Sequence, residues 1–409
     1  MRRFSALALL AVAALALAVP AAAAEPLRID ADLALVQDAG QYAAAFAVTS
    51  EEALGRLKAQ QASIMLTERL RYGHRDRLVS IALEHRPTWG VVVRLAGPER
   101  PADFIGEAGG HRIPVRFVVG LTSTRAAALR LLDARRNDLP GLVPGYRGAG
   151  VDPETGGLVV MQRPSADLRP AAEVAAELAI TLGLPVRIRR LEAQLTDSAA
   201  IGGGRVEGPN PDGRRFRCTT GFVVRNPARQ LGVTTAAHCP DNLSWRGPDG
   251  EERLLPMAGA WGTAEHDLQI HTGVGPAQGL VFSDTAKTMV RPVTGWTTRP
   301  QTRPGDWLCM RGESSGYACA TVELVDFAPP GALCGGLCAA SWVTVAGPHC
   351  RRGDSGAPFF LGTTAFGILK GGAYLADGGC AFSYYQSVDY LPDGWRIERA
   401  SAAPAIAPD

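Results

Sequence analysis

The chain has 409 residues, a formal net charge of +2 and 20% charged residues. This near-neutral balance argues against a nucleic-acid-binding protein and against a protein held on an anionic membrane surface. The hydrophobic content of 46% is ordinary for a globular protein, and the length predicts two or three domains.

Residues 1–24 have the pattern of a secretory signal peptide. Arg2 and Arg3 precede an apolar stretch at 4–19, and three alanines at 22–24 precede Glu25. A basic start, a short apolar stretch and small residues are typical of a cleaved export signal. A membrane anchor is the alternative, but the stretch is short for a helix that crosses a bilayer. We therefore predict a secreted protein, extracellular or periplasmic, that binds no membrane and can contain disulfides.

Residues 25–199 are predicted to form a small α/β region. The capping box Thr49-Ser50-Glu51-Glu52 begins a helix that continues to Leu70. The elements expected next are strands at 90–95 and 113–119, a helix from Ser123 to Arg135, a strand at 158–161, a helix at 171–182 stopped by Gly183, and a strand at 185–191. This alternation predicts helices on one face of a sheet. The scattered histidines His74, His85 and His111 predict no site.

From about residue 200 the pattern changes to short strands between glycine-rich turns, and 31 of the 47 glycines lie there. A hairpin is expected from 221–224 and 231–235. Further strands are expected at 269–271, 288–293, 307–310, 320–325, 341–345, 358–361, 366–369 and 382–387. Many short strands with few helices predict closed antiparallel barrels or a sandwich. The end of the chain, 396–409, is expected to be a flexible tail.

The eight cysteines all lie between residues 218 and 380. An even number confined to one half of an exported chain predicts a disulfide framework. Zinc binding through Cys334 and Cys338 is the alternative, but no histidine or second cysteine pair has matching spacing around them. A metal site at His266 and His271 is disfavoured as well. We expect no metal and no organic cofactor.

Three short motifs in the second half carry chemistry. Ser355 lies in Gly353-Asp354-Ser355-Gly356-Ala357-Pro358, where small turn-forming residues can present its hydroxyl on a tight bend. His238 lies in Thr234-Thr235-Ala236-Ala237-His238-Cys239, and Asp267 lies in Glu265-His266-Asp267-Leu268-Gln269-Ile270. A serine hydroxyl needs a neighbouring base, and a carboxylate holds that base in the correct tautomer.

Together these motifs resemble the chymotrypsin-like serine proteases, and among them the secreted bacterial branch of α-lytic protease and the streptogrisins. The resemblance covers about residues 200–395. It implies an all-β catalytic domain of two six-stranded barrels with the site in the cleft between them, preceded by the α/β region at 25–199 as a pro-region. It implies a catalytic triad of His238, Asp267 and Ser355. The backbone N–H groups of Gly353 and Ser355 would form the oxyanion hole.

The same resemblance implies a zymogen whose pro-region assists folding and inhibits the catalytic domain. Cleavage is expected in the small-residue segment 196–204, with Ile201 as the new amino terminus. An adhesion or peptide-binding module is the alternative interpretation of residues 25–199. The expected partners are a protein or peptide substrate and the chain's own pro-region, and a monomer is expected. The cysteine pairs implied are Cys218–Cys239, Cys309–Cys319 and Cys350–Cys380, which leaves Cys334 and Cys338 to each other.

The segment Lys370-Gly371-Gly372 aligns with a family segment that usually reads Ser-x-Gly or Ser-Gly-Gly and pairs with the substrate backbone. Lys370 replaces a serine that contacts the triad carboxylate. Its ammonium is therefore expected either to compete with His238 for Asp267 or to extend to solvent. We expect a Lys370→Ser variant to keep or raise peptidase turnover.

Two features near the serine affect the specificity pocket and its support. Arg352, with Arg351, is expected at the mouth of the pocket, where it either favours acidic side chains or is simply solvated. Asp354 is expected to be buried and to need a cationic partner. Arg311 and a new amino terminus at Ile201 are the two candidates.

Two other functions compete with a secreted serine endopeptidase. The first is a catalytically inactive homologue that binds peptides through its cleft. The second is an esterase that uses the same triad.

Overall fold

The computed structural model describes residues 27–163, 169–191, 194–197, 203–210, 212–246, 252–274, 279–347 and 350–400. Three expectations lie outside these residues: the signal peptide, the cleavage position before Ile201, and residues 401–409 of the tail expected from residue 396. The beginning of that expected tail is instead a strand, because β27 (Arg396–Ile397) pairs with β12 (Val223–Arg225). Among the helices described, none has the length and apolar character needed to cross a membrane.

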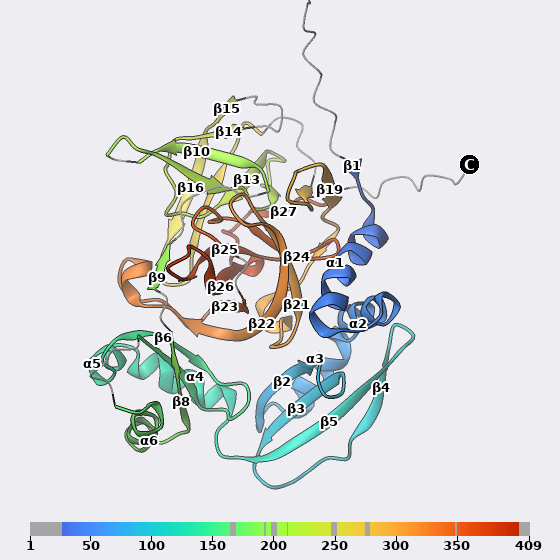
Figure 1. Ribbon diagram of the computed structural model, residues 1–409, viewed down its shortest axis with the longest axis vertical. Coiled ribbons are helices and arrows are strands. Elements are labelled where there is room, and N and C mark those ends of the chain that lie inside the picture. The colour runs from blue at the N-terminus through green and yellow to red at the C-terminus, as the bar shows by residue number, and fades with distance from the viewer. Residues whose placement is uncertain are drawn as a thin grey trace, which may run out of the picture.

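The described helices lie in the N-terminal half (Figure 1). They are α1 (Ala31–Phe46), α2 (Ser50–Ala62), α3 (Ile64–Gly73), α4 (Arg125–Arg135), α5 (Leu139–Leu142) and α6 (Ala171–Leu182). The single helix predicted from Thr49 is two helices, because α2 ends at Ala62 and α3 begins at Ile64, with Ser63 as the cap between them. Thr49 caps α2 as expected, by accepting the backbone N–H of Glu52. The cap of α4 is Thr124 and not Ser123.

Two groups of strands contact these helices. The strands of this half are β1 (Leu27–Arg28), β2 (Leu78–Glu84), β3 (Gly90–Ala96), β4 (Phe104–Ala108), β5 (His111–Leu121), β6 (Tyr146–Val151), β7 (Leu158–Gln162), β8 (Val186–Arg190) and β9 (Gln194–Asp197). One sheet has the order β2-β3-β5-β4 and contacts α2, α3 and α4. In the other group β6, β7 and β8 lie side by side and contact α4 and α6. The predicted α/β character of this half is confirmed.

The second half is almost entirely β structure. Its strands are β10 (Arg205–Pro209), β11 (Arg215–Thr219), β12 (Val223–Arg225), β13 (Leu231–Thr235), β14 (Leu243–Arg246), β15 (Glu252–Leu255), β16 (Met257–Gly262), β17 (Asp267–His271), β18 (Leu280–Phe282), β19 (Met289–Pro292), β20 (Gly295–Trp296), β21 (Trp307–Gly312), β22 (Gly316–Ala328), β23 (Trp342–Ala346), β24 (Pro358–Leu361), β25 (Thr364–Tyr374), β26 (Cys380–Ser387) and β27 (Arg396–Ile397). Short 3₁₀ turns lie at Arg299–Gln301, Gly331–Cys334 and Val388–Tyr390.

Six of these strands close into the expected barrel. Their order is β21-β24-β25-β26-β23-β22, and β22 pairs back with β21. Strands β10 to β17 form two separate sheets, β11-β10-β14-β15 and β16-β17-β13-β12-β27, the second of which includes β27 from the end of the chain. β18 and β19 pair with β1 in a third sheet. The first barrel is therefore not a single closed ring of hydrogen bonds among the described residues.

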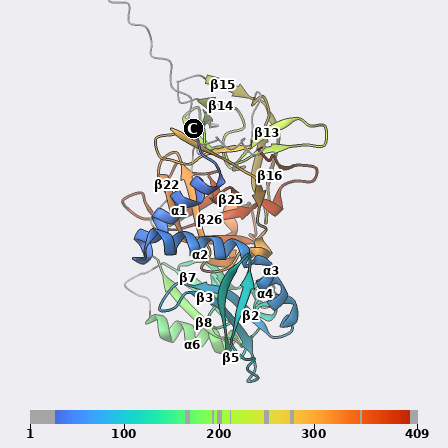
Figure 2. The ribbon, with the colours of Figure 1, turned by 90° about the vertical axis from the view of Figure 1, so that its right-hand side faces the viewer.

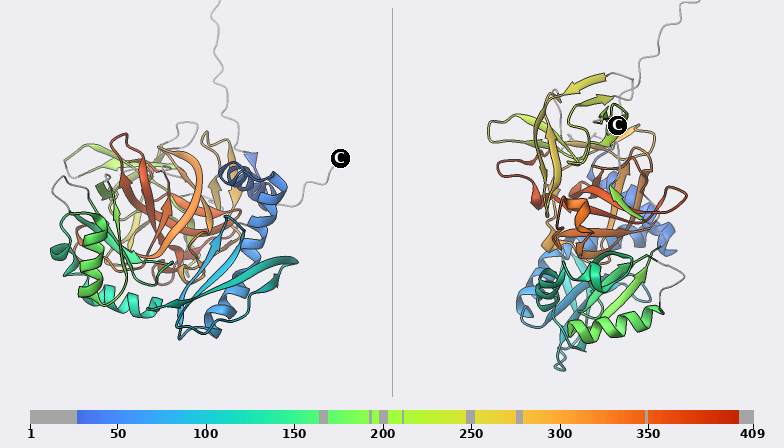
Figure 3. Two further views of the ribbon diagram at one scale, coloured as in Figure 1. Left: turned by 60° about the horizontal axis from the view of Figure 1, so that its bottom comes forward. Right: turned by 90° about the vertical axis from the view of Figure 1, so that its left-hand side faces the viewer.

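The two halves lie against each other (Figures 2 and 3). They share two hydrogen-bonded sheets and an apolar core. β6 pairs antiparallel with β22, and β9 pairs antiparallel with β25. Leu35, Tyr42 and Leu57 of α1 and α2 belong to the same buried cluster as Trp307 and Phe360 of the barrel. The N-terminal helices thus pack into the core of the β-rich half.

Candidate active site

The structure brings His238, Asp267 and Ser355 into one hydrogen-bonded row. His238 follows β13, and Asp267 is the first residue of β17, the neighbour of β13 in the sheet. Ser355 lies in the turn before β24. His238 Nδ1 is 2.7 Å from Asp267 Oδ2, and His238 Nε2 is 2.8 Å from Ser355 Oγ. A neutral imidazole that donates Nδ1–H to the carboxylate therefore turns its Nε2 lone pair to the serine hydroxyl.

Asp267 is buried and held on several sides. Its Oδ1 accepts the backbone N–H of His238 at 3.1 Å, and its own N–H donates to Gln386 Oε1 at 2.6 Å. Burial alone would raise the pKa of Asp267, but the charges of His238 and Lys370 outweigh burial and hold it well below its usual range. Asp267 is thus a carboxylate across the neutral range. No sequence motif marked Gln386, which lies on β26, far along the chain.

Lys370 is the second group on the Asp267 carboxylate. Its Nζ lies 3.1 Å from Asp267 Oδ2, and its side chain is 3% exposed. The same Nζ is 5.5 Å from the centre of the Trp342 ring. Of the two positions expected for this ammonium, the structure shows the one beside Asp267 and not the one in solvent.

The turn that bears Ser355 depends on two glycines. Gly353 has φ 118° and Gly356 has φ 91°, which are values that favour glycine. A Cβ at Gly356 would also collide with the carbonyl oxygen of Thr219. Ala357 is not among the described residues with positive φ, so alanine fits there.

The Asp354 carboxylate is buried without the arginine proposed for it. It accepts backbone N–H groups from Ser314 at 2.9 Å and Arg351 at 2.7 Å. Burial raises the pKa of its carboxyl, and these hydrogen bonds oppose that rise. The Arg311 interpretation was wrong, because Arg311 donates to Glu313 at 2.6 Å. Along β21 the next residue, Gly312, faces Asp354, so the side chain of Arg311 points to the other face of the strand.

Comparison with known proteins identifies a relative that matches about half of the chain. Streptogrisin-C of Streptomyces griseus is 25% identical over 225 residues, which are 50% of this chain and 42% of that protein. The chain is similar to the bacterial chymotrypsin-like serine proteases. It matches less than half the length of the streptogrisin. No family model matches the chain.

Solved protease structures also align with about half of the chain. Protease A of Thermobifida fusca is 22% identical, and the alignment covers 49% of this chain and 98% of that one with a TM-score of 0.39. Chymotrypsin of Cellulomonas bogoriensis is 22% identical, with 49% and 99% covered and a TM-score of 0.37.

The edge of β25 beside the serine is already paired in this protease-like chain. Gly371 and Gly372 lie opposite Asp197 and Thr196 of β9 in an antiparallel register. A Cβ at Gly372 would approach Cys350 Sγ to 2.6 Å, so this edge has no room for a side chain there. The position predicted to bind a substrate backbone is therefore occupied by the chain itself.

Arg352 lies outside the row of three residues. Its side chain is exposed, and its guanidinium lies 5.1 Å from the centre of the Tyr374 ring. Arg351 is also exposed and approaches the carbonyl oxygen of Asp377 at 3.4 Å. Both arginines therefore lie at the surface, next to the turn that bears Ser355.

All eight cysteines form disulfides. The pairs are Cys218–Cys239, Cys309–Cys319, Cys334–Cys338 and Cys350–Cys380. Cys334 and Cys338 are bonded to each other, so neither is available as a thiolate for zinc. The Cys218–Cys239 bond ties β11 to the residue after His238.

We expect the disulfide next to His238 to stabilise the protein more than the small Cys334–Cys338 loop. Loop-closure entropy predicts a loss of about 3 kcal/mol for a Cys218→Ala/Cys239→Ala variant and about 2 kcal/mol for Cys334→Ala/Cys338→Ala. Denaturant unfolding of both variants measures the difference. An equal or larger loss for the small loop would contradict this ranking.

Proposed function

We propose that the chain is a secreted serine endopeptidase that hydrolyses peptide bonds through an acyl-enzyme. The observation that carries the proposal is the unbroken row of contacts from Asp267 through His238 to Ser355, at 2.7 and 2.8 Å. A hydroxyl, an imidazole and a buried carboxylate in this order are the parts needed to activate a serine as a nucleophile.

In the proposed reaction Ser355 Oγ attacks the substrate carbonyl carbon while His238 Nε2 takes the hydroxyl proton. Asp267 stabilises the imidazolium through Nδ1–H. The oxyanion is assigned to the backbone N–H groups of Gly353 and Ser355, and one such donor contributes about 3 kcal/mol in related sites. His238 then gives its proton to the leaving amine. Water repeats the sequence on the ester and releases the acid and Ser355.

An extended peptide is the proposed substrate, because the recognition surface proposed to be exposed once β9 leaves is a strand edge. Gly371 and Gly372 offer backbone groups to a strand that runs antiparallel to β25, as β9 does. This favours a peptidase over an esterase, since a small ester makes no use of such an edge.

Residues 25–199 are proposed as the pro-region, and 200–395 as the catalytic domain that it inhibits. The pairing of β9 with β25 supports inhibition, because β9 occupies the edge assigned to substrate. The extensive buried contacts of α1 and α2 with the barrel support a role in folding.

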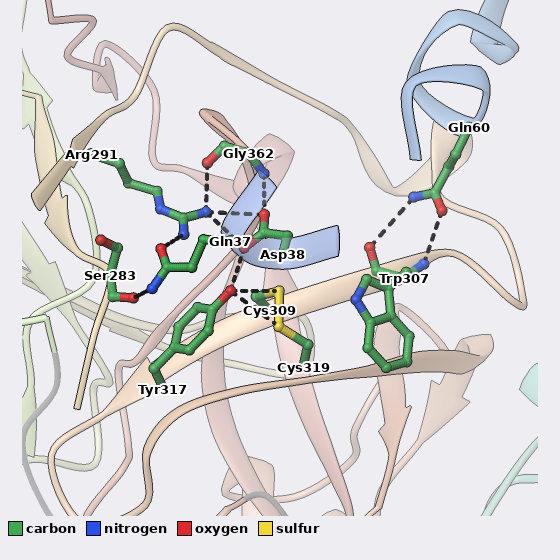
Figure 4. Close-up of a disulfide and its surroundings, with 10 residues drawn as sticks. All are labelled: Gln37, Asp38, Gln60, Ser283, Arg291, Trp307, Cys309, Tyr317, Cys319 and Gly362. Atoms are coloured by element: carbon green, nitrogen blue, oxygen red, sulfur yellow. Dashed lines mark hydrogen bonds and ion pairs between the residues drawn. A yellow bond between two sulfur atoms is a disulfide. The ribbon is translucent and has the colours of Figure 1, made fainter. Parts of the chain in front are cut away.

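Those contacts centre on Asp38 of α1 (Figure 4). Arg291 Nη1 lies 3.0 Å from both Asp38 oxygens, and both side chains are 0% exposed. The backbone N–H of Gly362 and the hydroxyl of Tyr317 also donate to Asp38. A second contact joins Gln60 of α2 to the backbone of Trp307. Groups from the N-terminal half thus contact β19 and the barrel strand β21.

Covalent labelling of the mature protein tests the proposed function. We expect a fluorophosphonate to modify Ser355 stoichiometrically, and we expect casein-derived peptides to be cleaved. Mass spectrometry locates the label, and amino-terminal sequencing locates the cut between the two halves. A folded, mature protein that takes no label would favour the peptide-binding homologue. Turnover of small esters without amides would favour the esterase.

A further inference from the structure

Lys370 lies next to both ends of the row formed by Asp267, His238 and Ser355. Its Nζ lies 3.1 Å from Asp267 Oδ2, the same oxygen that faces His238 Nδ1 at 2.7 Å. Its carbonyl oxygen lies 3.4 Å from Ser355 Oγ. Two donors, one of them an ammonium, therefore share one carboxylate oxygen in the interior of the protein.

This arrangement changes the charge balance when His238 takes a proton. With Asp267 alone, an imidazolium and a carboxylate sum to zero. With the Lys370 ammonium on the same carboxylate, the group carries one net positive charge after proton transfer. Like charges at such distances in a buried site oppose protonation of the imidazole.

Two contacts hold the Lys370 ammonium in place. Its side chain is 3% exposed and lies over the face of the Trp342 ring on β23, whose quadrupole attracts a cation. Asp267 supplies the opposite charge. From β26, the neighbouring strand, the uncharged Gln386 holds the backbone of Asp267.

Other ionisable groups near the row are directed elsewhere in the described part of the chain. Asp354 precedes Ser355 but is bound by the backbone N–H groups of the 314–315 turn and of Arg351. His266 precedes Asp267, but its Nδ1 is 2.9 Å from Thr263 Oγ1, and its ring contacts Tyr390. The charged groups of Glu265, Arg299 and Asp389 act on the pKa of Tyr390, which is outside the row.

We propose that Lys370 is a positioning residue that, through Asp267, keeps His238 neutral and the serine reactive at more acidic pH than an uncharged residue would allow. This inference rests on the proposed peptidase function. Lys370 also weakens the support that Asp267 gives to the imidazolium, so the same residue lowers the rate in the neutral plateau while it extends activity toward acid.

The pH profile of kcat/KM for a peptide substrate tests the inference. Removing the ammonium in Lys370→Ser or Lys370→Met is expected to shift the acid limb of the profile to higher pH, by about 1–2 pH units. Turnover in the neutral plateau is expected to stay equal or rise. Lys370→Arg retains the charge and is expected to keep the acid limb of the unmodified enzyme. Lys287→Ser, which removes the other lysine of the second half, a residue that pairs with Glu313 and lies outside the row, is the matched control.

A second measurement separates failure of this inference from failure of the proposed function. In full-length chains that carry Ser355→Ala, the ring protons of His238 can be titrated by NMR with Lys370 present or replaced. The midpoint is expected to rise when the ammonium is removed, whether or not the chain cleaves peptides, and this chain remains uncut. An unchanged midpoint in folded Lys370→Ser and Lys370→Met chains would overturn the inference. So would an acid limb that moves as far in Lys370→Arg as in Lys370→Ser.

Discussion

A Ser355→Ala variant is expected to lose about six orders of magnitude in peptidase turnover. Triad members act as a unit, so removing the nucleophile alone abolishes the acyl-enzyme route and leaves only the weak effect of binding and the oxyanion hole. Without self-cleavage, the variant is expected to accumulate as one chain that contains both halves. Initial rates on a fluorogenic peptide and the mass of the purified protein measure both effects.

Ser387→Ala is the matched control for this experiment. Ser387 is also buried, on β26, and its Oγ contacts the carbonyl oxygen of Phe366 at 3.4 Å. That variant is expected to mature and to cleave peptides at the rate of the unmodified chain. Peptide cleavage by Ser355→Ala within tenfold of normal would disprove the assignment of Ser355 as nucleophile.

An Asp38→Ala variant is expected to destabilise the full-length chain by about 3–5 kcal/mol, because it leaves a buried guanidinium without its carboxylate. Arg291 is fully buried, and its Nη1 donates to both Asp38 oxygens and to the carbonyl oxygen of Gly362. Denaturant unfolding in the uncut Ser355→Ala background measures the change in free energy. The yield of refolded protein is expected to fall in parallel.

Asp32→Ala is the control, because Asp32 is exposed on the same helix and its loss is expected to cost less than about 0.5 kcal/mol. An Asp38→Leu/Arg291→Met chain replaces the pair by apolar groups and is expected to recover most of the lost stability. Equal stability of the Asp38→Ala and Asp32→Ala chains would refute the structural role given to this ion pair.

The parts of the fold that could be predicted were those with strong local signals. β24 lies at Pro358–Leu361 as predicted, and α6 ends at Gly183, which has φ 71°. Helix α1 escaped prediction because its buried face includes the charged Asp38, which interrupts the apolar period. Asp38 is buried only because Arg291, some 250 residues later, lies against it, and no local pattern contains that information.

The residues of the candidate site likewise fall into those that a local pattern marks and those that it does not. His238, Asp267 and Ser355 stood out because three short motifs occur together in the order His, Asp, Ser, although each motif alone is a weak signal. Gln386 did not, because a lone glutamine in a strand has no distinguishing pattern. The sequence could not decide between the two positions considered for the Lys370 ammonium, since a long side chain can reach either Asp267 or solvent.

The pairing of β6 with β22 and of β9 with β25 has a consequence for the proposed activation by cleavage. Cleavage of one peptide bond near residue 200 would leave both strand pairings in place. Cleavage of the chain and release of the N-terminal half are therefore separate events. The nicked species is a non-covalent complex whose two fragments dissociate with a rate of their own. Peptidase activity would then appear when dilution or proteolysis removes the N-terminal fragment, and not at the moment of cleavage.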